Sequence, residues 1–327
     1  MSSADHGLTR RDLLTGILGS AAAAATLGPR AAAGQGRARV VRVESGKAWV
    51  GDKRDPAIVA EMVNRGLLAF TGKTRPQDAW AQFVRPGTRV GLKINLLGRP
   101  LLYTAPEMTD AIVVGLLAAG AKPAEIIVWD RHASHFGPTR YAPGQGAHGE
   151  RVMTGGQYDS ARACQASGGQ APIDRIATEH TDVTVNLPML KNHGMAGVTL
   201  ALKNIAFGCY SHHRAAHGGN CDPFIAEAYK HYLTQTSVPV HILDATEACY
   251  DQGPQPGGTD VIWRENAIYV ATDPVALDVV CRDVILEKQR AAGLSSRLSS
   301  CRHIETAAQM GLGVGDRSLI DLTTIKV

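Results

Sequence analysis

Short runs of β-branched residues alternate along the chain with longer segments of helical periodicity. This alternation predicts an α/β fold, a mainly parallel sheet with helices on both faces. The expected strands span residues 39–43, 89–95, 125–129, 182–186, 238–243, 267–271 and 320–325. The expected helices span residues 56–70, 106–119, 173–180, 197–207, 223–234, 274–289 and 303–310.

The length of 327 residues fits one large domain or two lobes that share a cleft. Residues 136–171 are rich in Gly, Ser and Gln and show no clear period. We therefore expect a loop-rich insertion there, within an α/β domain that occupies residues 34–327.

Residues 1–33 have the features of an export signal. Arg10-Arg11 precedes an Ala- and Gly-rich stretch, and Ala31-Ala32-Ala33 offers the small residues that a signal peptidase reads. The apolar stretch is about a dozen weakly hydrophobic residues, whereas roughly 20 are needed to span a bilayer. We expect a twin-arginine signal, recognition by the twin-arginine translocase, a periplasmic or secreted protein, and no transmembrane segment in the mature chain.

The charge pattern argues against a nucleic-acid partner. The 34 Lys and Arg residues nearly balance the 30 Asp and Glu residues, and no run gathers the basic ones. A nucleic-acid protein needs a basic patch, and single strands also need aromatic stacking platforms, yet only 5% of the residues are aromatic. The expected partner is a small-molecule substrate.

The six cysteines contain no C-x-x-C pair, the spacing of zinc ribbons and thioredoxin motifs. Cys209 and Cys221 bracket a His-rich loop, where they either form a disulfide after export or stay as buried thiols. Two glycine-containing segments, at residues 72–74 and 311–315, lack the spacing and the strand–helix context of phosphate-binding loops. Neither ATP nor NAD is implied.

Polar residues gather where predicted strands end, which is the edge at which parallel sheets bind ligands. Asp130, His132 and His135 follow one strand. Carboxylate and imidazole ligands at this spacing suit a divalent first-row metal, but a turn-capping aspartate with solvated histidines fits equally well. His213 and His217 belong to a second His-rich loop, for which we expect metal or anion binding.

A lysine and a histidine follow another predicted strand, and a second lysine lies ten residues after that histidine. These are Lys191, His193 and Lys203. Lys203 lies in an expected helix, where the dipole of the first turns lowers a lysine pKa and favours the neutral amine of nucleophilic or covalent cofactor chemistry. The alternative is a surface lysine with its stem on apolar neighbours.

Residues 185–204, VNLPMLKNHGMAGVTLALKN, resemble the domain of unknown function 362 family. So do ATDPVALD at residues 271–278 and GLG at residues 311–313. The likeness runs from about residue 90 to the end of the chain. Some members of that family carry ferredoxin-like cysteine clusters, which this sequence lacks.

A shorter segment is similar to the nickel-dependent lactate racemase family. His193, Ala196-Gly197 and Lys203 match a motif in which the lysine holds a covalent nickel-pincer cofactor. Leu200-Ala201 replaces the Gly-Gly that precedes the lysine in that family, and His217 is the nearest match to its later nickel-binding histidine. The resemblance implies a cofactor anchor at Lys203 and proton or hydride abstraction at a carbon that bears a hydroxyl.

These features favour an exported enzyme with a divalent transition metal, including the nickel-pincer type, that acts on a small polar or anionic substrate by racemase, epimerase or redox chemistry. The candidate catalytic residues are Lys191, His193 and Lys203, with Lys203 also the cofactor site. The candidate metal ligands are Asp130, His132, His135, His193, His213 and His217. The alternative is a periplasmic protein that binds a metal or ligand without turnover.

Overall fold

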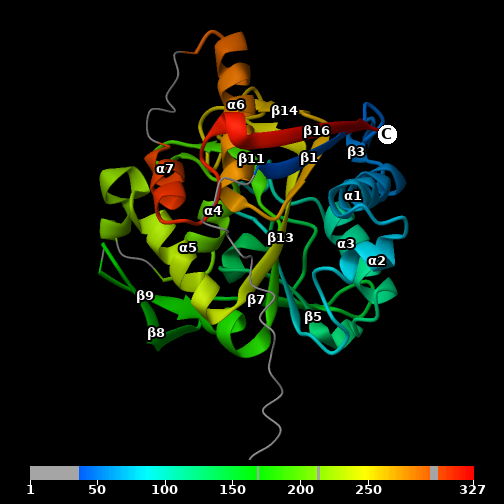
Figure 1. Ribbon diagram of the computed structural model, residues 1–327, viewed down its shortest axis with the longest axis horizontal. Coiled ribbons are helices and arrows are strands. Elements are labelled where there is room, and N and C mark those ends of the chain that lie inside the picture. Colours follow the sequence, from blue (N-terminus) through cyan, green and yellow to red (C-terminus); the bar gives the residue numbers. More distant parts are fainter. Residues whose placement is uncertain (1–36, 168, 212–213, 295–300) are drawn as a thin grey trace, which may run out of the picture.

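The protein is one α/β domain built on a large mixed sheet (Figure 1). This computed structural model describes residues 37–167, 169–211, 214–294 and 301–327. Within them the sheet has 12 strands. Its main path runs β16 (Ile320–Lys326), β1 (Ala38–Glu44), β15 (Ala267–Ala271), β13 (Ser237–Cys249), β10 (Val183–Asn186), β4 (Val90–Lys93), β5 (Ile126–Asp130), β7 (Arg151–Thr154) and β6 (Gly144–Gln145).

The centre of the sheet is parallel. β4 pairs in parallel with both β5 and β10, and β10 pairs in parallel with β13. Every residue of β5 is buried, as expected for a parallel strand that is covered on both faces. β15 runs antiparallel to β13 and β1, so the sheet is mixed but mainly parallel, which confirms the predicted class.

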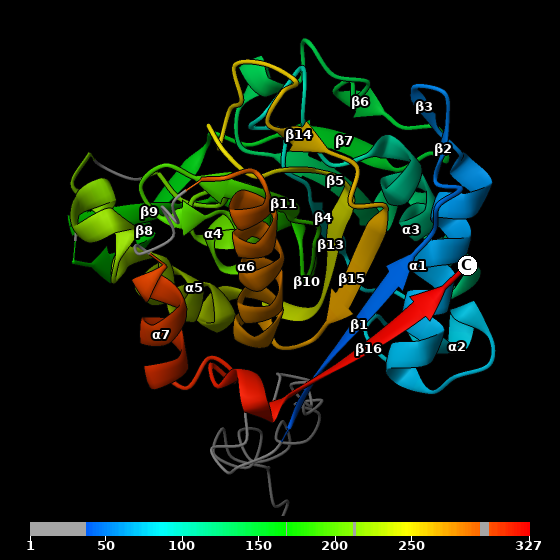
Figure 2. The same ribbon diagram turned by 90° about the horizontal axis from the view of Figure 1, so that it is seen from above.

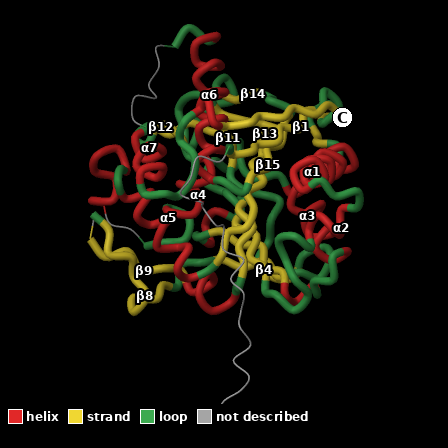
Figure 3. The backbone as a smooth tube through the Cα atoms, viewed as in Figure 1, coloured by secondary structure: helices red, strands yellow, loops and turns green. Residues whose placement is uncertain are grey.

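Helices cover both faces of the sheet (Figures 2 and 3). Each face has its own hydrophobic core. One face carries α1 (Pro56–Thr71), α2 (Pro76–Trp80) and α3 (Pro106–Ala118). The other carries α4 (Leu200–Ala206), α5 (Phe224–Gln235), α6 (Pro274–Ala291) and α7 (Arg302–Gln309). The two layers of helices hold the strand ends of the sheet in fixed positions.

Helix starts follow the sequence closely. α1 and α6 both begin with a proline, whose missing N–H needs no partner in the first turn. Asp55 and Asp273 precede those prolines, and each side chain accepts backbone N–H groups of the first turn, at 2.9 Å from Ala57 N and 2.8 Å from Ala276 N.

The structure differs from expectation at two places in the middle of the chain. Residues 136–171 are not only loop: they hold β6, β7, and β8 (Tyr158–Ala166), which pairs with β9 (Gly169–Asp174) as a separate hairpin. The helix expected at residues 173–180 is the end of β9 followed by a π-helical turn, Ile176–His180. These strands are stabilised by their pairing partners, so their polar sequences carry little period of their own.

The predicted twin-arginine signal, residues 1–33, lies outside the described residues. Across the part of the chain that is described, no helix combines the length and the apolar character needed to cross a bilayer.

Candidate functional site

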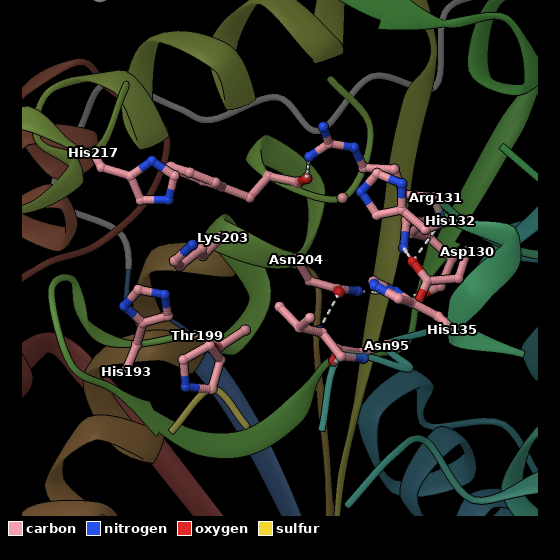
Figure 4. A pocket seen from close by; sticks show the side chains of 15 residues that line it. Asn95, Asp130, Arg131, His132, His135, His193, Thr199, Lys203, Asn204 and His217 are labelled. Carbon is pink, nitrogen blue, oxygen red and sulfur yellow. Dashed lines mark hydrogen bonds and ion pairs between the residues drawn. The ribbon is translucent and has the colours of Figure 1, made fainter. Parts of the chain in front are cut away.

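A cavity of about 260 Å³ lies beyond the carboxyl ends of β4 and β5, where the parallel strands end (Figure 4). Segments far apart in sequence form its lining. The described lining residues are Lys93, Asn95, Leu97, Asp130, Arg131, His132, His135, His193, Thr199, Lys203, Asn204, Phe207, Gly208, His217 and Pro254. The cavity is smaller than the roughly 300–1,000 Å³ that drug-sized ligands fill, which favours a small metabolite.

A buried ion pair joins the two central strands at this pocket. Lys93 Nζ donates to Asp130 Oδ1 at 2.8 Å. The carboxylate also accepts the backbone N–H groups of Arg131, at 2.7 Å to Oδ1, and Leu96, at 2.7 Å to Oδ2, and His135 Nδ1 lies 3.8 Å from Oδ2. The pKa of Asp130 lies below its usual range, because Lys93 and these donors outweigh the effect of burial. Asp130 thus orders the loops after β4 and β5 and is not a vacant metal ligand.

Gly208 leaves room for the Lys93 side chain. A Cβ atom at this position would lie 2.1 Å from the Asn204 carbonyl oxygen and 3.0 Å from Lys93 Nζ. Only glycine allows this close approach.

Three buried asparagines form the floor between the strands. Asn95 Nδ2 donates to Asn204 Oδ1 at 2.9 Å, and Asn204 Nδ2 donates to Asn186 Oδ1 at 2.7 Å. Asn186 Nδ2 in turn donates to the carbonyl oxygen of Ala201 at 3.0 Å. These bonds tie the segment after β4 to β10 and α4, so the pocket wall is held from three parts of the chain.

Lys191 lies behind the pocket wall, although we expected it to contact substrate. It is on β11 (Met189–His193), a strand that pairs with β13, and it is fully buried. Its amine donates to Asn95 Oδ1 at 2.8 Å and to the Pro254 carbonyl at 3.3 Å, two residues that do line the cavity. Burial lowers the pKa of Lys191 to about 7. Because of the direction of β11, Lys191 supports residues of the pocket wall and does not itself line the cavity.

Lys203 lies in the pocket on α4, a helix whose residues are all buried. Asp278 of α6 accepts the N–H groups of Ala201 at 2.7 Å and Leu202 at 3.1 Å, which fixes the start of this helix. Lys203 Nζ lies 3.4 Å from the Phe207 ring centroid. No hydrogen-bond acceptor or carboxylate among the described residues pairs with this amine. Burial, more than the helix dipole that we expected, lowers the pKa of Lys203 to about 8.

His193, at the end of β11, lies beside Lys203 in the pocket (Figure 4). Its Nδ1 atom accepts the backbone N–H groups of both Met195 and Ala196 at 3.1 Å. Nδ1 is therefore the acceptor of the neutral ring, and Nε2 carries the proton. Burial, with the nearby lysines, lowers the pKa of His193 to about 2. The ring is consequently a neutral hydrogen-bond donor and not a base.

Arg131, His132 and His135 occupy the other side of the cavity (Figure 4). The Arg131 side chain donates from Nε to the Tyr158 hydroxyl at 2.8 Å and from Nη1 to the Phe207 carbonyl at 3.0 Å. The β8–β9 hairpin thus helps to orient Arg131. The rings of His132 and His135 pack edge to face with centroids 4.9 Å apart, and burial lowers the pKa of His132.

The second His-rich loop contributes one described residue to the pocket, His217, whose ring packs against Phe207 with centroids 5.0 Å apart. His213 lies outside the described residues. Cys209 and Cys221 are both buried free thiols, so the disulfide alternative is wrong for this structure.

The described residues do not fit a divalent metal. No three of their His, Cys, Asp or Glu side chains are grouped so as to hold one. His193 uses Nδ1 as an acceptor and keeps a proton on Nε2, and Asp130 is occupied by Lys93 and backbone donors. A ligating histidine needs the opposite arrangement, with one nitrogen donating to an acceptor and the other free for the metal.

Sequence reasoning missed several lining residues. Lys93 and Asn95 were available as signals, because a charged and an amide residue interrupt an apolar strand that ends at the ligand-binding edge. Thr199 gave no signal: its hydroxyl is buried in the pocket wall without a hydrogen-bond partner among the described residues.

A family model described as "Domain of unknown function (DUF362)" matches residues 90–283, more than half of the chain. The chain belongs to this family. The matched region of this DUF362 protein contains every described residue that lines the pocket. The family description assigns no activity.

Two further proteins are similar to the DUF362 chain. The thylakoid-associated protein sll1697 of Synechocystis is 29% identical over 238 residues, which cover 67% of this chain and 70% of that protein. A crystal structure of a protein from Thermotoga maritima matches 80% of this chain at 12% identity and a TM-score of 0.42. The chain spans 61% of the length of that second protein.

Proposed function

We propose that the protein is an enzyme that moves a proton at the α-carbon of a small carboxylate. The observation that carries this proposal is the Lys203 amine: it is buried in the cavity, has no hydrogen-bonding or carboxylate partner among the described residues, and has a pKa of about 8. A lysine with such a pKa is partly uncharged near neutral pH and mostly uncharged above pH 8, and the uncharged amine is the form that a general base requires.

His193 and Thr199 complete the arrangement. When Lys203 removes the α-proton, the electron pair of the C–H bond moves onto the substrate carboxylate. The donors that we propose for the extra charge on those oxygens are the Nε2–H of His193 and the hydroxyl of Thr199, which has no hydrogen-bond partner among the described residues. The Lys203 ammonium then returns the proton, and return to the opposite face gives the epimer.

The pocket chemistry supports an anionic substrate. Among the lining residues that the structure describes, Lys93 and Arg131 are cationic, Lys203 is cationic only in its protonated form, and Asp130 is the one carboxylate. A positive site of this kind attracts anions and strengthens hydrogen bonds to a developing negative charge. We also propose that the protein is an isomerase and that it is exported by the twin-arginine route.

Proton transfer is tested by NMR in D₂O. Small 2-hydroxy carboxylates that raise the melting temperature of the protein are incubated with it, and loss of the α-proton signal is followed. We expect exchange with the wild type, at least about 100-fold slower exchange with Lys203→Met, and no change with the exposed control Lys230→Met. Exchange that persists in Lys203→Met, or its absence for every carboxylate that binds, would overturn the proposal.

A further inference from the structure

A second cavity, of about 450 Å³, lies at a different place in the protein. Its described lining comes from the hairpin of β2 (Trp49–Val50) and β3 (Lys53–Arg54), the loop after β4, the strand β13, and β14 (Ile262–Trp263) with the residues beside it. The two cavities have no described lining residue in common. Its volume is within the roughly 300–1,000 Å³ of small-molecule sites, so this cavity can hold a ligand of its own.

The charged side chains of this second cavity are already paired with one another. Arg54 Nη2 donates to Glu247 Oε2 at 3.2 Å, and Arg264 Nη2 donates to Asp52 Oδ1 at 3.1 Å. These two pairs account for every charged side chain in the described lining. An anion would have to displace a carboxylate from an arginine, and a cation would have to displace an arginine from a carboxylate. The lining therefore favours an uncharged ligand.

The two arginines are held in place by several contacts. Their guanidinium carbons lie 4.4 Å (Arg54) and 4.1 Å (Arg264) from the centroid of the Trp49 ring. Arg54 Nε also donates to Thr246 Oγ1 at 2.8 Å, and Arg264 Nη1 donates to the Gly51 carbonyl oxygen at 3.0 Å. A guanidinium has more N–H donors than these contacts use, so each arginine can also donate to a ligand from a fixed position.

The lining also offers polar atoms that are open to a ligand, next to apolar surface. The hydroxyls of Tyr103 and Thr259 and the Oε1 atom of Glu247 have no hydrogen-bond partner among the described residues. The indole N–H of Trp263 donates to Glu265 at 3.0 Å, which leaves the ring as apolar surface. Further apolar surface comes from Pro100, Leu101 and Ile262.

From these observations we propose that the second cavity is a binding site for an uncharged sugar, a hexose unit. A hexose presents apolar C–H groups on its ring faces and hydroxyls, which both donate and accept, around its edge. The hydroxyls suit the open arginine N–H groups and the oxygens of the lining, and the C–H faces suit its apolar side chains. A flat apolar ligand would instead leave these polar groups without water or a partner, which is costly. The site is separate from the proposed proton transfer.

Calorimetric titration of the full protein tests the proposal with glucose, galactose and mannose. We expect at least one of these hexoses to bind, with a dissociation constant of about 1 mM or lower. The uronate and the 6-amino-6-deoxy derivative of that hexose place a negative or a positive charge at the same carbon. Both should bind at least about tenfold more weakly, because each disturbs an ion pair of the lining. No binding of any of the three hexoses, or equal or tighter binding of a charged derivative, would overturn the proposal.

Substitutions assign the bound sugar to this cavity. Thr259→Val removes a hydroxyl while keeping the side-chain shape and should weaken binding about tenfold, and Trp263→Ala should weaken it further through the loss of apolar surface. Thr323→Val, on the exposed edge strand β16, is the matched control and should bind the hexose as the wild type does. Lys203→Met should also keep the wild-type affinity. Unchanged affinity in both Thr259→Val and Trp263→Ala, or loss of binding in Lys203→Met, would place the sugar elsewhere and overturn the proposal.

Discussion

Lys93 Nζ lies 2.8 Å from Asp130 Oδ1, and the two side chains are only 1% and 6% exposed. The pair links the neighbouring strands β4 and β5 where the pocket begins. Burying two charges is costly, and their attraction offsets this cost only while both are present.

Removing one partner of this ion pair should therefore destabilise the fold strongly. We expect Asp130→Asn to lower the free energy of unfolding by about 3–5 kcal/mol, because the Lys93 ammonium loses its counter-charge. Urea unfolding measures this change. Asp78→Asn is the matched control, since it breaks the exposed pair with Arg75 and should cost at most about 1 kcal/mol. Equal effects of the two substitutions would contradict a structural role for the buried pair.

Gly208 should not tolerate a side chain. In Gly208→Ala the new Cβ would lie 2.1 Å from a backbone oxygen of Asn204, which cannot move aside, and 2.9 Å from Lys93 Cε. We expect a loss of about 1–3 kcal/mol of stability, as for other overpacked sites, together with weaker binding of anions. Gly46→Ala is the control, because a Cβ atom added at Gly46 would have no neighbour within 4 Å. A Gly208→Ala protein as stable as Gly46→Ala would show that Gly208 does not lie this close to Asn204 and Lys93.

Lys191 should make stability depend on pH. Its pKa is about 7 in the folded protein and 10.5 as the reference value, so between these pH values the unfolded chain binds a proton that the folded chain lacks. Stability from this group therefore rises with pH across that window, by up to about 1.4 kcal/mol per pH unit, and the penalty of burial is complete below pH 7.

The comparison of Lys191→Met with the wild type isolates this effect from other titrating groups. We expect the difference in unfolding free energy to favour the variant most at pH 6 and to shift steadily toward the wild type from pH 7 to pH 9. Denaturant unfolding at several pH values measures it. A difference that does not change with pH would mean that the Lys191 amine has an ordinary pKa.

Thr199 should serve the ligand more than the fold. Its hydroxyl has no described hydrogen-bond partner, so Thr199→Val removes no internal bond, and we expect unfolding free energy to stay within about 1 kcal/mol of the wild type. Affinity for a bound carboxylate should fall about tenfold, because one hydrogen bond to a charged group is lost. Titration calorimetry gives the affinity, and Thr323→Val on the exposed edge strand β16 is the control. An unchanged affinity of Thr199→Val for the carboxylate would show that the Thr199 hydroxyl does not contact the ligand.

Much of the fold was predictable from local sequence. All seven expected strands exist, because β-branched runs mark buried strands. Prolines in turn mark the starts of helices. β11 was not predicted, since the sequence around Lys191 and His193 is poor in strand-forming residues and the strand exists through its pairing with β13. The hairpin of β8 and β9 escaped prediction for the same reason.

The candidate site was predictable in part. The rule that ligands bind at the carboxyl ends of parallel strands led to Asp130, His132 and His193, and the spacing after His193 led to Lys203. The structure places all four in one lining. Their chemistry was less accessible, because it depends on partners distant in sequence. Nothing in the sequence shows that Lys93 forms an ion pair with Asp130, or that backbone donors to Nδ1 fix the proton of His193 on Nε2.

The proposed proton transfer depends most on the protonation state of the Lys203 amine. Its pKa can be measured by NMR with lysine labelled with ¹³C at Cε, following the signal that is missing from the spectrum of Lys203→Met while the pH is raised. The account predicts a titration midpoint near 8, well below the reference value of 10.5. A midpoint at or above 10 would show a permanently charged lysine and would contradict its role as the base.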